Sequence, residues 1–189
     1  RNADAQAGDV LVLGKPLGVG ILSAALKKGL LDAAGYADML RYTTQLNRVG
    51  IALGALDGVH AMTDVTGFGL AGHLLEVCRG SGLSAQVELA SVPLIEAAAR
   101  FAAKGVVTGA SARNWAAYGA DVVGVTGTPE WQRNLLTDPQ TSGGLLVSCS
   151  PDALARVLDC FHQAGFAAAA AIGGMQARAP GQGSQLLCR

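Results

Sequence analysis

Short apolar runs alternate with segments of helical periodicity along the chain. Runs rich in Val, Leu and Ile, or with weak two-residue alternation, predict extended strands. The strands expected from this pattern are 9–15, 59–65, 83–92, 122–125, 145–150, 166–177 and a last edge strand within 183–189. The helices expected are 19–29, 32–56, 67–82, 94–105, 114–118, one that begins near 128, and 150–165.

The longest of these segments, 32–56, predicts one continuous helix that packs against the core. Its apolar side chains recur every three or four positions and therefore share one helix face. These side chains are Met39, Tyr42, Leu46, Val49, Leu53 and Leu56. The pair Asp57 and Gly58 is a turn signal that is expected to end the helix.

Three other helices carry start signals. Pro93 is expected in the first turn of the helix that follows it, because proline fits an N-terminal turn. Thr128 is predicted to cap a helix whose first turn contains Pro129. Ser150 is predicted to cap the helix that starts at Pro151.

Strands and helices alternate unevenly, with two helical segments after the first strand. Such alternation favours a layered α/β or α+β domain with a mixed sheet. No repeat and no linker composition divides 1–189, so we expect a single domain. The chain begins with neither Met nor a recognisable tag and runs almost at once into a strand. We therefore expect it to be part of a longer chain.

Composition argues against two classes of partner. Apolar residues make up 50% of the chain, and 14 basic residues balance 14 acidic ones. Without net positive charge there is no basic field to hold nucleic acid, and no apolar run of about 18 residues predicts a membrane span. There is also no signal-peptide pattern. The four cysteines form no C-x-x-C and are expected to be free thiols in a reducing cytoplasm.

The first candidate site lies in 61–75, AMTDVTGFGLAGHLL. Asp64 falls where a strand should end, so its carboxylate is a candidate ligand for Mg²⁺, which prefers oxygen donors. Thr66, Gly67 and Gly69 follow it; glycines allow close backbone approach, and free amides at a helix start attract anions. One aspartate cannot hold the ion alone. The alternative is that Asp64 or Thr66 only caps the helix.

The second candidate is the loop LTDPQTSGG, 136–144. Asp138 precedes a proline turn, and Gln140, Thr141 and Ser142 continue it toward a strand. The functional interpretation is a polar loop beside the site, and the alternative is a turn without further role.

Two weaker candidates complete the set. Lys15 stands at a predicted strand end, where an ammonium group can meet a phosphate; a solvated lysine is the alternative. Asn114 and Trp115 are a candidate recognition loop.

Three strings together resemble the carboxyl-terminal half of the selenophosphate synthetase (selenide, water dikinase) family. They are GDVLVLGKPLGVGI, MTDVTGFGLAGHLLE and LTDPQTSGGLLVS, in this order and spacing. The likeness extends over nearly the whole chain. The wider superfamily contains aminoimidazole ribonucleotide synthetase, the formylglycinamidine synthetase large chain and a hydrogenase-maturation factor. Gly14 and Val19 stand here where the family usually has threonines.

The resemblance implies an ATP-dependent transfer in which selenide, ATP and water become selenophosphate, AMP and phosphate, with Mg²⁺. In that family an amino-terminal half, which this chain lacks, carries the catalytic residues, most metal aspartates and the dimer barrel. No catalytic residue is therefore expected here, and Asp64 matches the metal ligand of the second half. The implied fold is α+β, three-layer α/β/α, with a mixed and partly ferredoxin-like sheet.

These expectations leave two alternatives open. One is a domain of another ATP-dependent enzyme of the aminoimidazole ribonucleotide synthetase superfamily. The other is a binding or scaffold module without catalysis. In the leading hypothesis the isolated chain is inactive, because ATP and selenide need the missing half, and the full-length enzyme is a homodimer.

Overall fold

The computed structural model describes residues 2–189 and contains one mixed seven-stranded sheet. Its strands are β1 (Val10–Leu13), β2 (Val59–Asp64), β3 (Leu83–Val87), β4 (Val122–Val123), β5 (Leu145–Cys149), β6 (Ala170–Ala177) and β7 (Leu186–Cys188). They lie in the order β2-β5-β1-β6-β3-β7-β4. All neighbours are antiparallel except the pairs that β7 makes with β3 and β4.

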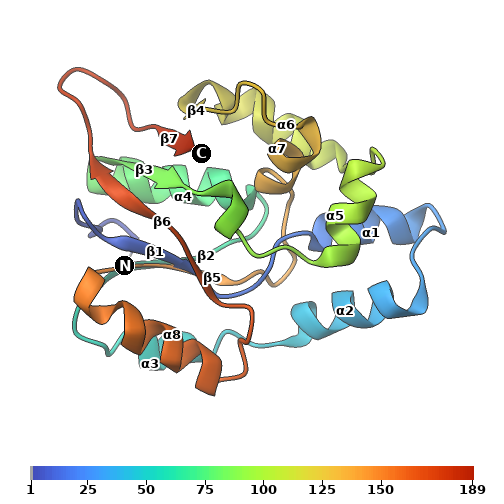
Figure 1. Ribbon diagram of the computed structural model, residues 1–189, viewed down its shortest axis with the longest axis horizontal. Coiled ribbons are helices and arrows are strands. Elements are labelled where there is room, and N and C mark those ends of the chain that lie inside the picture. The colour runs from blue at the N-terminus through green and yellow to red at the C-terminus, as the bar shows by residue number, and fades with distance from the viewer. Residues whose placement is uncertain (1) are drawn as a thin grey trace.

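Helices cover both faces of this sheet (Figure 1). They are α1 (Val19–Lys27), α2 (Ala33–Thr44), α3 (Val49–Leu53), α4 (Gly69–Ser81), α5 (Glu96–Ala103), α6 (Gly109–Tyr118), α7 (Glu130–Leu136) and α8 (Leu154–Gln163). Single 3₁₀ turns lie at Leu89–Ser91, Gly119–Asp121 and Pro151–Ala153. The α+β class with a mixed sheet, predicted from the sequence, is confirmed.

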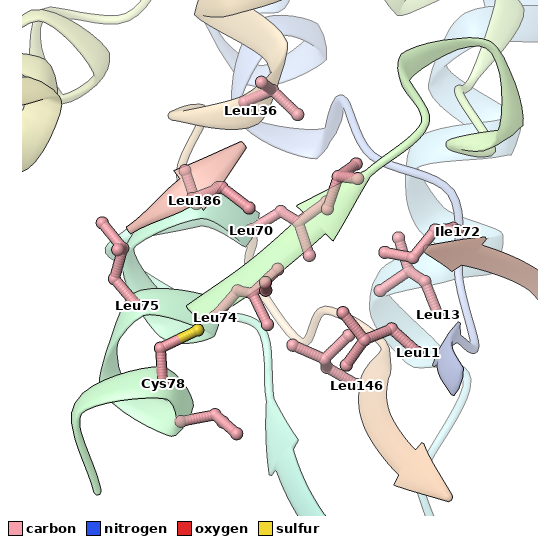
Figure 2. Close-up of a cluster of buried hydrophobic side chains, with 14 of the residues drawn as sticks. Leu11, Leu13, Leu70, Leu74, Leu75, Cys78, Leu136, Leu146, Ile172 and Leu186 are labelled. Carbon is pink, nitrogen blue, oxygen red and sulfur yellow. The ribbon is translucent and has the colours of Figure 1, made fainter. Parts of the chain in front are cut away.

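The larger core lies between the sheet and α4. Figure 2 shows Leu70, Leu74 and Cys78 of α4 opposite Leu11 and Leu146 of β1 and β5. All five side chains are almost fully buried. Side chains of one face recur at every second strand position, so the odd-numbered residues of β1 face α4.

The opposite face of the sheet packs on α3 and α8. Val12 of β1 points to this side, where it meets Leu53 of α3 and Val157 and Phe161 of α8. At β1, β5 and β2 the sheet is therefore covered on both faces and forms the middle of three layers. A smaller apolar cluster joins α1 to α5 and α7 beside the sheet.

The predicted continuous helix 32–56 is wrong. The chain leaves the helical conformation at Gln45, whose ψ is 112°, and resumes it at Val49 as α3. Leu46, predicted to be in the core, is 61% exposed. The periodicity continues across the break, but the carbonyls at the end of α2 are used by Lys15, as described below.

The helix starts are also corrected. Pro93 and Leu94 are extended, because Leu17 and Leu94 form a parallel bridge, and α5 begins only at Glu96. Thr128 is not a cap, since Pro129 occupies that position of α7. Ser150 makes no side-chain cap bond.

Two further strand predictions have different outcomes. The alanine-rich segment ending in Ile-Gly-Gly does form a strand, β6. The last strand, β7, is not at an edge, because it lies between β3 and β4. Within residues 2–189, no helix has the length and hydropathy needed to cross a bilayer. All four cysteines are free thiols.

Candidate functional site

The three segments singled out in the sequence converge in space. The Val65 amide donates to the Gly144 carbonyl over 2.9 Å, and the Gln140 amide donates to the Thr66 carbonyl over 3.0 Å. The Gly14 amide donates to the Leu145 carbonyl over 2.9 Å. The loop 136–144 therefore contacts the Asp64 turn, and the first residue of β5, directly after the loop, contacts the segment that leads to α1.

Asp64 is the last residue of β2, an edge strand of the sheet, where it pairs with Leu145 of β5. Its side chain is exposed. Among residues 2–189, no hydrogen bond or ion pair engages its carboxylate. The carboxylate oxygens are thus available to a ligand that approaches the edge of the sheet from outside.

A single carboxylate is not a complete cation site. No group of three or more His, Cys, Asp or Glu side chains within 2–189 is arranged to hold a metal ion. The exposed and unpaired oxygens of Asp64 suit a hard divalent cation, which keeps waters and substrate oxygens as other ligands. Asp64 is suited to supply one ligand of a metal site whose other ligands come from outside residues 2–189.

The turn after Asp64 is built mainly by its own contacts. The Gly69 amide donates to the Thr66 carbonyl over 3.0 Å, so it is not free for an anion, which corrects the predicted amide cluster at that residue. Gly69 has a φ of 68°, and a β-carbon there would lie 2.7 Å from the Leu136 carbonyl oxygen. Glycine is required there by both conformation and space. Gly67 is exposed, with open space around it.

Neither Asp64 nor Thr66 caps α4, which rules out the alternative interpretation of this turn. The helix starts after Phe68 without a side-chain cap bond. Instead, the Thr66 hydroxyl lies 3.1 Å from Nε2 of His73, whose Nδ1 lies 2.9 Å from the Glu76 carboxylate. Thr66 is therefore held by the first turns of α4.

Helix α6 fixes the same turn from outside, a contact that the sequence did not reveal. The Asn114 side-chain amide donates to the carbonyls of Gly67 (2.9 Å) and Thr137 (3.0 Å). The Tyr118 hydroxyl donates to the Phe68 carbonyl. Asn114 is 9% exposed, so the predicted recognition loop is wrong: this side chain joins two loops. Trp115 instead stacks under the Arg133 guanidinium, 4.6 Å from the ring centroid.

Asp138 and Gln140 are buried at the start of α1. Gln140 Oε1 accepts from the amides of Gly18 (3.1 Å) and Val19 (3.2 Å), and Asp138 Oδ2 accepts from the Ile21 amide (3.2 Å). The Gln140 side-chain amide donates back to Asp138 Oδ2 over 3.0 Å. The loop thus supplies the N-terminal cap that α1 lacks in its own sequence.

The burial of Asp138 has a cost. Its Oδ1 atom is buried without a hydrogen-bond partner among residues 2–189. Desolvation raises the pKa of Asp138 to about 7, against the opposing effects of its bonds to Ile21, Gln140 and Gly20. Asp138 is thus a structural group whose proton is retained far above the usual range of aspartate.

Lys15 is a buried structural residue. It is neither the exposed phosphate ligand nor the solvated lysine that the sequence analysis considered. The side chain is 2% exposed. Its Nζ donates to the carbonyls of Tyr42 (3.0 Å), Gln45 (2.7 Å) and Ser142 (2.7 Å). A protonated amine has three N–H donors, and all three are used. Lys15 ties the end of α2 to the loop 136–144.

The remaining two loop residues are exposed. Ser142 has a φ of 52° and presents its carbonyl to Lys15, while its hydroxyl has no hydrogen bond within 2–189. Thr141 is exposed and lines a cavity beside α1 and α6.

The Lys15 contacts generate a stability prediction. Lys15→Met should lower the free energy of unfolding by roughly 2–4 kcal/mol, because three carbonyls lose the charged donor that the buried Lys15 supplies. Urea denaturation measures this change. Lys104→Met, which changes an exposed lysine, should stay within about 0.5 kcal/mol of the parent. Equal effects of the two substitutions would contradict the role given to Lys15.

Asp138 predicts a pH dependence. Since its folded-state pKa is raised to about 7, the folded chain keeps a proton that the unfolded chain releases above about pH 4. Stability should therefore fall as the pH rises from about 4 to 7, and then level off. Asp138→Asn should remove this component, roughly 1–4 kcal/mol, in denaturation curves compared at pH 4.5 and 8. Asp159→Asn, at an exposed position, should leave the slope unchanged.

Curated relatives match nearly the whole of this chain. The chain is 64% identical over 175 residues to the selenide, water dikinase of Burkholderia ambifaria, and 60% identical over 180 residues to that of Pseudomonas straminea. These matches cover 93% and 95% of this chain but 49% and 50% of the relatives. The chain thus spans about half the length of the curated relatives it matches.

Solved structures show the same fold at low sequence identity. The hydrogenase maturation protein HypE matches with a TM-score of 0.70 and 20% identity, over 99% of this chain and 51% of that one. Thiamine-monophosphate kinase from Stenotrophomonas maltophilia matches with a TM-score of 0.64 and 20% identity, over 98% and 52% of the chains. Residues 6–183 match the family described as AIR synthase related protein, C-terminal domain. From the fold, the converging loops and this match, the chain belongs to the AIR synthase related family, as its C-terminal domain.

Proposed function

We propose that this chain is the C-terminal half of an ATP- and Mg²⁺-dependent selenide, water dikinase, which makes selenophosphate, AMP and phosphate from selenide, ATP and water. The observation that carries the proposal is the 64% identity to the Burkholderia ambifaria enzyme across 93% of this chain. The likeness to HypE and thiamine-monophosphate kinase, at 20% identity, concerns the fold and favours no other substrate.

The role of this half follows from Asp64. Its unpaired carboxylate at the end of β2 supplies one oxygen ligand, and the other half of the protein supplies the rest of a shared Mg²⁺ site. Bound there, Mg²⁺ neutralises charge on the phosphates of ATP. The chain's own residues hold the carboxylate in place: β5 pairs with β2, and α6 fixes the turn that follows.

The exposed position of Asp64 supports the proposal that catalysis needs two halves. Phosphoryl transfer depends on positioning and on exclusion of water, and an exposed edge carboxylate provides neither alone. The proposal therefore includes an inactive isolated chain and a full-length enzyme that is a cytoplasmic homodimer. ATP and selenide bind where the two halves meet.

The metal-ligand role predicts a kinetic defect. In the full-length protein, Asp64→Asn should lower kcat on the order of a hundredfold or more, with the thermal midpoint within about 2 °C of the parent, because an exposed side chain contributes little to folding. Selenide-dependent AMP formation measures the rate. Asp57→Asn, a second exposed carboxylate just before the same strand, is the matched control and should keep near-normal activity. A normal rate for Asp64→Asn would refute the proposed role.

The dependence on the missing half has its own test. The isolated 189-residue chain should convert no ATP to AMP with selenide beyond a protein-free control. Adding the separately expressed amino-terminal half should restore turnover. Substantial turnover by the isolated chain would contradict the shared site. No AMP formation by any full-length form, under conditions where a curated relative is active, would favour a binding or scaffold module.

A further inference from the structure

A cavity of about 500 Å³ lies between α1, α6 and the loop 136–144, and no residue of the turn after Asp64 lines it. It is bounded by one face of α1 from Gly20 to Lys27, the first turn of α6 and the loop 136–144. Three cationic side chains line it: Lys27 and Lys28 from α1, and Arg113 from α6. No aspartate or glutamate within 2–189 contributes to its wall.

These three cations are unpaired. Among residues 2–189, no hydrogen bond or ion pair engages the side chains of Lys27, Lys28 or Arg113. Four other arginines of the chain do form ion pairs with carboxylates: Arg41, Arg79, Arg100 and Arg133. In a chain of zero net charge, three free cations around one hollow are a local excess of positive charge.

Backbone polarity adds to this charge. Helix α6 has ten residues and begins at the cavity, where Thr108 accepts from the Ser111 amide. The amides of Gly109 and Ala110 have no acceptor within 2–189. Arg113 folds back toward this turn, since its Nη1 lies 3.5 Å from the place of a β-carbon on Gly109. Free first-turn amides and the helix dipole favour an anion at this point.

We propose that this cavity binds a phosphate-bearing anion with at least two negative charges. The three cations are exposed, and a ligand with a single negative charge would neutralise only one of them, whereas an apolar ligand would displace their water without compensation. Arginine and lysine with free helix amides form the usual donor set for phosphate groups. The volume lies in the range of small-molecule sites and admits pyrophosphate or the phosphates of a nucleotide.

The proposed site goes beyond the proposed function, because this half of the protein forms it alone and without a metal. It is nevertheless connected to Asp64 through the same loop. Thr141 lines the cavity, and three residues later the Gly144 carbonyl accepts from Val65, next to Asp64. An anion bound here would contact the loop that supports the edge of the sheet.

Calorimetric titration without divalent ions tests the proposal. Inorganic pyrophosphate, inorganic phosphate and ADP are titrated separately into the chain, so that a free anion and a nucleotide phosphate are distinguished. We expect saturable binding of pyrophosphate or ADP that weakens as salt is raised. Arg113→Gln should weaken it about tenfold or more, as expected for loss of one charged donor. Arg178→Gln, an exposed cation after β6, should change it less than twofold.

A second variant separates binding from folding. Ala110→Glu places a carboxylate in the first turn of α6, where the helix dipole favours it, so the thermal midpoint should be kept. The same carboxylate faces the anion in the cavity, so binding should be lost. Unchanged binding by both Arg113→Gln and Ala110→Glu, or no saturable binding by the parent at millimolar concentration, would overturn the proposal. Asp64→Asn should bind the anion normally, so failure of this site and failure of the proposed function are distinguishable.

Discussion

The buried contact between the loop 136–144 and the start of α1 is the constraint on which the site depends. Gln140 and Asp138 accept from amides that α1 cannot satisfy itself, because its first turn has no side-chain cap. Leaving such amides unpaired in the core costs about 1–3 kcal/mol each. The loop therefore cannot move without exposing the end of the helix. This contact also explains why the polar side chains of Asp138 and Gln140 are almost fully buried.

Further hydrogen bonds connect the loop 136–144 to the edge of the sheet where Asp64 lies. Lys15 attaches the loop to the end of α2, and the Gly144 carbonyl attaches it to the residue after Asp64. Asn114 holds the following turn from the side of α6. The turn that follows the exposed carboxylate is thus held by the loop 136–144 and by α6. In a shared metal site such rigidity has value, because the ligand need not be reorganised when the other half approaches.

Local patterns predicted most strands and helices, and the loop 136–144 was predicted to lie beside the Asp64 turn, which it contacts. Asp64 was placed correctly at a strand end, since a polar residue after a short apolar run indicates one. The break at Gln45 does not follow from the local pattern, and the carbonyls of Tyr42 and Gln45 accept instead from Lys15, thirty positions before Gln45 in the chain. The same holds for Asp138 and Gln140: their residue types suit a turn, and only the fold shows that they cap a distant helix. Sequence periodicity carries no information about hydrogen bonds between residues that are distant in the chain.

Gly14 illustrates how a change in one motif involves a distant helix. A β-carbon at this position would lie 2.5 Å from Cε1 of Phe161, a fully buried ring that also packs edge-on against Phe166. The aromatic ring of α8 thus fills the volume of the missing side chain. Positions 14 and 161 therefore form a complementary pair in size: a relative with threonine at the first needs a smaller residue at the second, or a shifted α8. The size of the residue at position 14 is therefore limited by the size of the side chain that α8 packs against it.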